Sequence, residues 1–134
     1  MTAADQIISA VTIWRENRSG GAVGMQSILN VIMNRAAQRG TSAFVECLRP
    51  AQFSSMTEPG PEAVLWPSQA DSEDWAMWQE ALALVTQEAA GTLEDITEGS
   101  TDYYAPAGMP GGKAPYWAAS MTYTVTIANQ LFYK

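Results

Sequence analysis

The chain contains no histidine and only one cysteine among its 134 residues. Without histidine it can form neither a Ser-His-Asp nor a Cys-His catalytic apparatus, and no His-ligated zinc site. The single cysteine, Cys47, excludes a disulfide within the chain, and its apolar neighbours predict a buried structural thiol rather than a nucleophile. Carboxylates, hydroxyls and amides remain to carry any chemistry, and we expect no metal and no cofactor.

Basic residues are also scarce, because seven Lys and Arg against fourteen Asp and Glu give a formal net charge of −7. Nucleic acids and anionic membrane surfaces select for basic patches, so neither is an expected partner. The chain lacks the run of about 18 apolar residues that would span a membrane. Its N-terminus lacks the basic and apolar regions of a signal peptide. We therefore expect synthesis in the cytoplasm, no membrane insertion and no export signal.

What the chain does contain is enough apolar sequence, 47% of its residues, to form one core, and we expect a single domain over residues 1–134. Apolar periodicity predicts helices over 2–17 and 23–38, with another between Asp71 and Gly91. The helix after Asp71 should bury the stripe Trp75, Trp78, Leu82, Val85 and Ala89. A short helix after Gly40 should bury Phe44, Cys47 and Leu48.

Two further segments complete the predicted architecture. Residues 50–70 hold four of the seven prolines and should form a long irregular segment, which in a compact domain is usually functional or disordered. In the last third, residues 101–105 look extended, and apolar residues alternate with threonines over 121–127 as in a strand. The expected fold is α+β and mainly helical, with a small antiparallel sheet in the C-terminal third.

Glu16 is the most informative residue of the chain. It belongs to a helix that is apolar around most of its circumference and carries one narrow polar strip of Asp5, Ser9, Thr12 and Glu16. A carboxylate on a buried helix must find partners, raise its pKa or line a cleft. A carboxyl group that stays protonated near neutral pH is a general acid. The alternative is that the strip faces solvent and Glu16 lies at a frayed helix end beside Arg15 and Arg18.

Three motifs follow one another along nearly the whole chain. The first comprises Trp14-Arg15-Glu16-Asn17-Arg18, Gly24-Met25-Gln26-Ser27-Ile28 and Val31-Ile32-Met33-Asn34-Arg35, and the second is Gln52-Phe53-Ser54. The third comprises Asp95-Ile96-Thr97, Gly99-Ser100-Thr101-Asp102-Tyr103-Tyr104-Ala105-Pro106, Trp117 and Ile127-Ala128-Asn129-Gln130-Leu131-Phe132-Tyr133. In this order they resemble the cell wall hydrolase family that includes the spore-cortex-lytic enzymes. The chain departs from that family at Asp102 and Gln130, where the family has histidines, and at Ala128, where it has glycine.

The resemblance implies a lysozyme-like, transglycosylase-related fold that cleaves the glycan strands of peptidoglycan. It implies that Glu16 is the catalytic acid and base, with substrate-binding residues Gln52, Phe53, Ser54, Tyr103, Tyr104 and Trp117. Within this set Ser54 would hydrogen-bond Glu16 or an N-acetyl group, and Tyr103 or Tyr104 would orient the carboxyl or the sugar. Phe53 and Trp117 would offer stacking platforms, whereas burial is expected for Trp66. Ordinary packing remains the alternative for the tyrosines.

The mechanism follows from the number of carboxylates. A glycoside hydrolase needs two, whereas a lytic transglycosylase needs one glutamic acid and leaves 1,6-anhydromuramic ends. Asp95 is expected to fix a turn, and Asp102 replaces a family histidine, so a single acid favours the transglycosylase. The alternatives are a hydrolytic muramidase on the same fold, a non-catalytic glycan-binding module, and an anionic adaptor for a basic protein.

The missing export signal bears on where such an enzyme would act. Peptidoglycan lies outside the membrane, so we expect an enzyme that reaches the cell wall by holin-dependent release or on a virion, as a phage endolysin does. A bacterial catalytic domain separated from its leader would also meet this condition. We expect a monomer.

Overall fold

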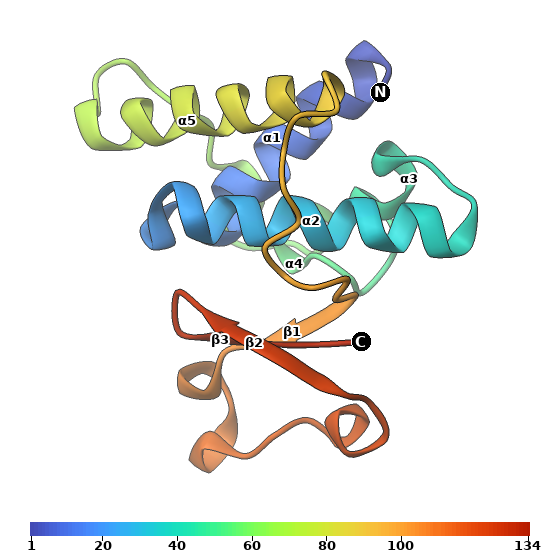
Figure 1. Ribbon diagram of the computed structural model, residues 1–134. Helices are drawn as coiled ribbons and strands as arrows, with labels where there is room; N and C mark the ends of the chain where they lie inside the picture. The colour runs from blue at the N-terminus through green and yellow to red at the C-terminus, as the bar shows by residue number, and fades with distance from the viewer.

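The computed structural model describes residues 1–134, and its helices precede its strands. In Figure 1 the helices lie above a small sheet, and the loop over residues 105–121 extends beyond that sheet. The elements are α1 (Ala3–Asn17), α2 (Gly21–Arg39), α3 (Ala43–Cys47), α4 (Ser54–Thr57), α5 (Ser72–Ala89), β1 (Asp102–Tyr104), β2 (Tyr123–Ile127) and β3 (Gln130–Tyr133). The predicted mainly helical α+β fold with a C-terminal antiparallel sheet is confirmed.

Helix α1 begins with a capping box. The Thr2 hydroxyl accepts a hydrogen bond from the Asp5 amide at 3.0 Å, and the Asp5 carboxylate accepts one from the Thr2 amide at 2.8 Å. Beyond this cap, α1 packs against α2 and α5 around the main apolar cluster. Its buried members are Ala10, Ile13, Trp14, Met25, Ile28, Leu29, Ile32, Ala43, Cys47, Phe53, Ala81, Leu84 and Val85.

The polar strip of α1 faces α3 rather than solvent or a cleft. Asp5, Ser9 and Thr12 are at most 6% exposed. The second carboxylate oxygen of Asp5 accepts a hydrogen bond from the Phe44 amide at 2.9 Å, which fixes the start of α3 against α1. Three of the four strip residues are therefore structural, and only Glu16, one turn further on, reaches open space.

Helix α3 is a single short element with Ser42 at its N-cap. The prediction that it buries three residues was wrong for two of them. Phe44 and Leu48 are 41% and 36% exposed, whereas Cys47 is fully buried as expected. The helix turns Ala43, Glu46 and Cys47 inward because the Glu46 carboxylate accepts hydrogen bonds from Arg39, Thr41 and Arg49. The full burial of Cys47 agrees with a structural thiol, and burial raises its pKa to about 11.

Helix α5 follows its predicted cap at Asp71 and ends before Gly91, but its buried face is shifted. Ala81, Leu84 and Val85 are buried, whereas Trp75, Trp78 and Leu82 are partly buried and Ala89 is exposed. The indole of Trp14 donates to the Asp74 carbonyl at 3.0 Å and joins the first turn of α5 to α1.

The sheet has the strand order β1-β3-β2, with all neighbours antiparallel. Phe132 of β3 is fully buried and packs with Ile127 of β2 and Val31 of α2, so the sheet is attached to the outer face of α2. The linker from α5 crosses α2 in Figure 1 before it enters β1. The Asp95 carboxylate fixes this linker by accepting from the amides of Thr97 (2.8 Å) and Gly99 (3.0 Å), as predicted.

None of the helices combines the length and the hydrophobicity that crossing a membrane requires.

Candidate active site

Glu16 lies in the last turn of α1, just before the chain reverses direction. Two glycines allow this reversal to close tightly. The side chain of Asn17 packs against Gly20 and Gly24, where an added Cβ would approach its amide group to 2.7 Å. The Asn17 amide also donates to Gln130 Oε1 at 3.1 Å, so the turn after Glu16 is tied to β3. The position of Glu16 is therefore set by contacts on both sides of the chain reversal.

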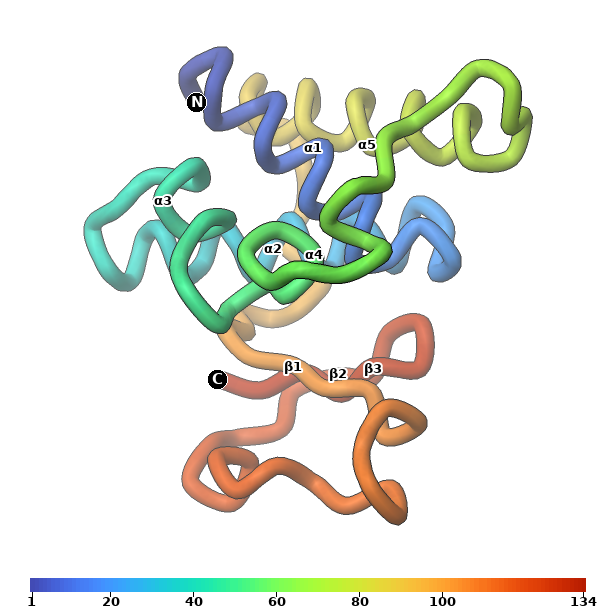
Figure 2. The backbone as a smooth tube through the Cα atoms, turned by 180° about the vertical axis from the view of Figure 1, so that it is seen from behind, coloured from blue at the N-terminus to red at the C-terminus, as the bar shows by residue number.

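The Glu16 side chain enters a polar cavity of about 370 Å³. The other lining residues are Arg15, Arg18, Ser19 and Glu62. We call this the acid pocket. Glu62 comes from the proline-rich segment 50–70, which Figure 2 shows in green as it passes the end of α1 on its way to α5. The irregular segment predicted from its prolines thus forms one wall of the pocket.

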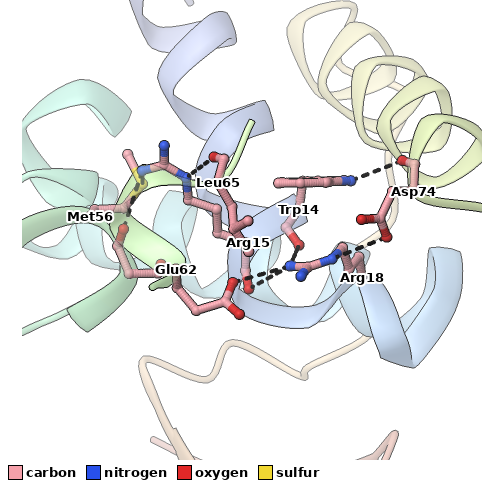
Figure 3. Close-up of polar contacts among 8 residues, drawn as sticks. Trp14, Arg15, Arg18, Met56, Glu62, Leu65 and Asp74 are labelled. Atoms are coloured by element: carbon pink, nitrogen blue, oxygen red, sulfur yellow. Dashed lines mark hydrogen bonds and ion pairs between the residues drawn. The ribbon is translucent and has the colours of Figure 1, made fainter. Parts of the chain in front are cut away.

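Two arginines of the α1 end hold that wall in place (Figure 3). Arg18 lies between two carboxylates, 3.2 Å from Glu62 and 3.3 Å from Asp74. Arg15 points the other way and donates to the carbonyl groups of Leu65 at 3.0 Å and Ser55 at 3.2 Å. These contacts join α1 to segments far along the sequence, so the pocket forms only when the whole domain has folded.

Trp66 was expected to be buried, and that prediction was wrong. Its side chain is 64% exposed, and the Arg15 guanidinium stacks over the ring at 4.8 Å from the centroid. The cation–π contact stabilises the ring in this exposed position.

Burial in the pocket raises the pKa of the Glu16 carboxyl above its ordinary value. The Ser55 hydroxyl opposes this effect, the charge of Glu62 adds to it, and the charge of Arg35 opposes it. Ser55 Oγ is itself buried without a hydrogen-bond partner of good geometry. The place of Glu16 in the pocket lining identifies a cleft carboxyl rather than a solvated, frayed helix end.

These neighbours predict that two substitutions shift the pKa of Glu16 in opposite directions. Ser55→Ala removes a group that favours the charged carboxylate, so the pKa of Glu16 should rise. Glu62→Gln removes a repelling negative charge, so the pKa should fall. Carboxyl-carbon NMR titration of labelled glutamate measures both shifts directly. Shifts of the same sign in the two variants would contradict this account of the pocket.

Tyr103 is the tyrosine that faces Glu16. Burial and the negative charge of Glu16 raise the pKa of the Tyr103 hydroxyl strongly, while Arg35 acts in the opposite direction. Its ring stacks on Phe132 at 5.4 Å between centroids. Tyr104 is the next residue of β1 and therefore points to the other face of the sheet. There it contacts Tyr133 and Trp117, so of the two tyrosines Tyr103 is the one with an electrostatic interaction with Glu16.

A second and larger cavity, of about 560 Å³, lies where Arg35 and Tyr103 meet the loop over 105–121. Its lining residues are Arg35, Ala51, Gln52, Asp102, Tyr103, Tyr116 and Trp117. We call this the aromatic pocket. Gln52 and Trp117, both predicted to bind substrate, lie together here. Arg35 and Tyr103 line this pocket, and each also interacts electrostatically with Glu16.

The Gln52-Phe53-Ser54 motif is placed differently from the prediction at two of its three residues. Phe53 is fully buried in the main core, with the Arg35 guanidinium over its ring at 5.3 Å, so it offers no face to a ligand. Ser54 is exposed at the start of α4, and the hydroxyl facing Glu16 belongs to Ser55 instead. The inward side chain of Phe53 sets this register, because it turns the next residue outward and Ser55 back inward.

Sequence reasoning missed three residues of this site. Arg35 was recognised only as part of the motif at the end of a helix. Its position on the buried side of α2 was the usable signal, because a buried arginine needs a polar partner. Ser55 directly follows the motif, and only the folded structure shows that its hydroxyl, and not that of Ser54, faces Glu16. Glu62 carries no local signal, since its role depends on a segment that returns to α1 from far along the chain.

The comparisons with known proteins agree on this chain. A family model described as cell wall hydrolase matches residues 19–133, so the match begins just after Glu16. Among solved structures, the catalytic domain of the germination-specific lytic transglycosylase SleB from Bacillus anthracis superposes with a TM-score of 0.71 at 18% sequence identity. The superposition covers 100% of this chain and 97% of that one, and it shows a common fold. No curated protein sequence matches.

Proposed function

The chain belongs to the cell wall hydrolase family and is an enzyme that cleaves peptidoglycan, and on that premise we propose that it is a lytic transglycosylase with Glu16 as its single acid and base. Membership of this family sets aside the binding module and the adaptor. The observation that carries the proposal is the carboxyl of Glu16, which opens into the acid pocket and has a pKa raised by burial.

The raised pKa suits the first step. A protonated Glu16 donates its proton to the glycosidic oxygen as the bond from that oxygen to C1 of the muramic acid breaks. The resulting carboxylate then accepts the proton of the C6 hydroxyl as O6 bonds to C1. The product is a 1,6-anhydromuramic end, no water is consumed, and Glu16 ends the cycle protonated. Tyr103 and Ser55 are proposed to hold the carboxyl in position through both proton transfers.

Glu16 lines the acid pocket, while two side chains of the aromatic pocket, Arg35 and Tyr103, interact with it electrostatically. We propose that sugars on the two sides of the cleaved bond occupy these two cavities. Gln52, Tyr103 and Trp117 then bind substrate, as proposed from the motifs, whereas Phe53 supports the site from the core.

One observation favours hydrolysis as a second candidate function. Glu62 places another carboxylate in the acid pocket, and a hydrolytic muramidase needs a second acid to activate water or to act as the nucleophile. Against this, Glu62 is paired with Arg18 at 3.2 Å, and its side chain is 49% exposed. Because its carboxylate is already engaged by Arg18, Glu62 is poorly placed to activate a water, whereas its charge does raise the pKa of Glu16.

The products separate the two candidates. Mass spectrometry of digested peptidoglycan should show muropeptides with 1,6-anhydromuramic ends, which are lighter by one water than the corresponding reducing ends. Glu62→Gln should give the same product ends as the unchanged enzyme. Reducing ends alone, lost on Glu62→Gln, would establish the hydrolytic mechanism instead.

A further inference from the structure

A single hydrogen bond joins a helix directly to a strand of the sheet, and it begins at the residue after Glu16. Asn17 Nδ2 at the end of α1 donates to Gln130 Oε1 of β3 at 3.1 Å. The other helix side chains that bond the C-terminal third reach only the linker over residues 94–101, and they are Gln26, Asn30, Asn34 and Arg35. The contact between Asn17 and Gln130 therefore ties the turn after Glu16 to the sheet itself.

Both ends of this hydrogen bond are held in place. Asn17 is only 7% exposed, and its amide group occupies the space left free by Gly20 and Gly24, where an added Cβ would approach it to 2.7 Å. Gln130 is the first residue of β3 and pairs with Ile127 across the hairpin. The bond therefore joins a confined side chain to a paired strand.

Strand β3 extends the connection to Tyr103. Residues two apart on a strand point to the same face of the sheet, so Gln130 and Phe132 both face the helices. Tyr103 of β1 pairs with Phe132, and the two rings stack at 5.4 Å between centroids. Tyr103 also interacts electrostatically with Glu16. The hydrogen bond thus links the segment that carries Glu16 to the sheet that carries Tyr103.

We propose that Asn17 and Gln130 are positioning residues, whose hydrogen bond fixes Glu16 relative to the sheet during proton transfer. This inference rests on the proposed function for the role of Glu16 as acid and base. A displacement of about 1 Å in a catalytic site can cost about 10²-fold in rate. Neither Asn17 nor Gln130 lines the acid pocket or the aromatic pocket, so their loss should lower kcat and leave substrate binding nearly unchanged.

The pair is uncharged, which suits its place beside the catalytic carboxyl. A charged side chain there would shift the pKa of Glu16, because a nearby charge favours one protonation state over the other. Neither Asn17 nor Gln130 is among the groups that shift this pKa. The hydrogen bond therefore positions Glu16 and leaves its acidity to the pocket residues.

The test compares three substitutions of glutamine. Gln130→Met keeps the length of the side chain but has no oxygen to accept from Asn17, and kcat should fall about tenfold with little change in KM. Gln130→Glu keeps an acceptor oxygen and should retain most of the kcat when each variant is measured at its own pH optimum. Gln26→Met is the matched control, because it removes the hydrogen bond to the Glu94 carbonyl, away from Glu16, and should leave kcat unchanged.

Three outcomes of these assays would overturn the proposal. The first is equal kcat in Gln130→Met and Gln26→Met, which would show that the hydrogen bond has no effect on the reaction. The second is an equal loss in Gln130→Met and Gln130→Glu, which would make the size or burial of the side chain responsible. The third is a rise in KM at constant kcat, because Gln130 would then bind substrate.

A measurement without turnover separates this inference from the proposed function. The amides of Arg18 and Gly21 donate to carbonyl groups within the turn. Gln130→Met should accelerate their hydrogen exchange about three- to tenfold, the loss expected for one hydrogen bond, while exchange in α5 stays unchanged and shows an intact fold. Unchanged exchange at Arg18 and Gly21 would refute the tie. Faster exchange together with full activity of Glu16→Gln would refute the proposed function instead.

Discussion

Replacing Glu16 by glutamine is expected to lower the rate of peptidoglycan cleavage by about 10²–10⁴-fold, the typical contribution of a general acid. The amide keeps the size and shape of the side chain but has no proton to donate to the glycosidic oxygen. Release of soluble muropeptides from purified cell walls measures the loss. Retention of more than about a tenth of the activity would contradict the role of Glu16, because the loss would then be smaller than a general acid supplies.

The control for this experiment lies in the same pocket. Glu62→Gln is the same chemical change at the other pocket carboxylate, and it should leave most of the activity in place. The two variants should also differ in their pH profiles. Activity of the unchanged enzyme should fall as the pH rises through the pKa of Glu16, because the acid loses the proton it must donate. Glu62→Gln should move that limb to lower pH, whereas any residual activity of Glu16→Gln should lack it.

The helices and the sheet were predictable because their signals are local. The 3.6-residue periodicity of α1 and α2, the alternation over 121–127 and the caps at Thr2 and Asp71 each lie within a few residues of the element they define. Glu16 could be singled out for the same reason, since a lone acid at the end of an apolar helix is visible in the sequence. The three motifs then indicated which segments of the chain contribute to the site.

The surroundings of Glu16 were less predictable because they depend on distant segments. The polar strip of α1 did not distinguish Asp5, which bonds the Phe44 amide, from Glu16, which lines a cavity. The proline-rich segment also does not reveal that Glu62 forms an ion pair with Arg18. Such contacts are settled by how whole elements pack, and a sequence pattern records only which faces are apolar.

Phe53 shows how a correct motif can be given the wrong physical role. A phenylalanine in a loop-rich segment was expected to be available to a sugar ring. In the structure it anchors that segment, because the chain around α4 has few other apolar side chains with which to reach the core. The ring is fully buried and supports the guanidinium of Arg35. Its importance to the site is therefore indirect.

This role predicts that Phe53→Ala acts on stability rather than on ligand binding. Removing a buried phenylalanine ring should lower the free energy of unfolding by about 3–5 kcal/mol. That is a large part of the roughly 5–15 kcal/mol that stabilises a typical domain. Denaturant unfolding followed by tryptophan fluorescence measures the change. Tyr116→Ala is the matched control, because this aromatic ring is 93% exposed and its loss should change stability by no more than about 0.5 kcal/mol.

The two aromatic substitutions should therefore affect different properties, one the stability and the other the KM. The folded fraction of Phe53→Ala should keep a KM for soluble glycan fragments close to that of the unchanged enzyme, whereas Tyr116→Ala should keep its stability and raise KM. A stable Phe53→Ala protein with weakened substrate binding would restore the stacking role expected from the sequence. That outcome would require the Phe53 ring to leave the core when substrate binds. The Arg35 guanidinium, which lies over that ring, would then lose its support.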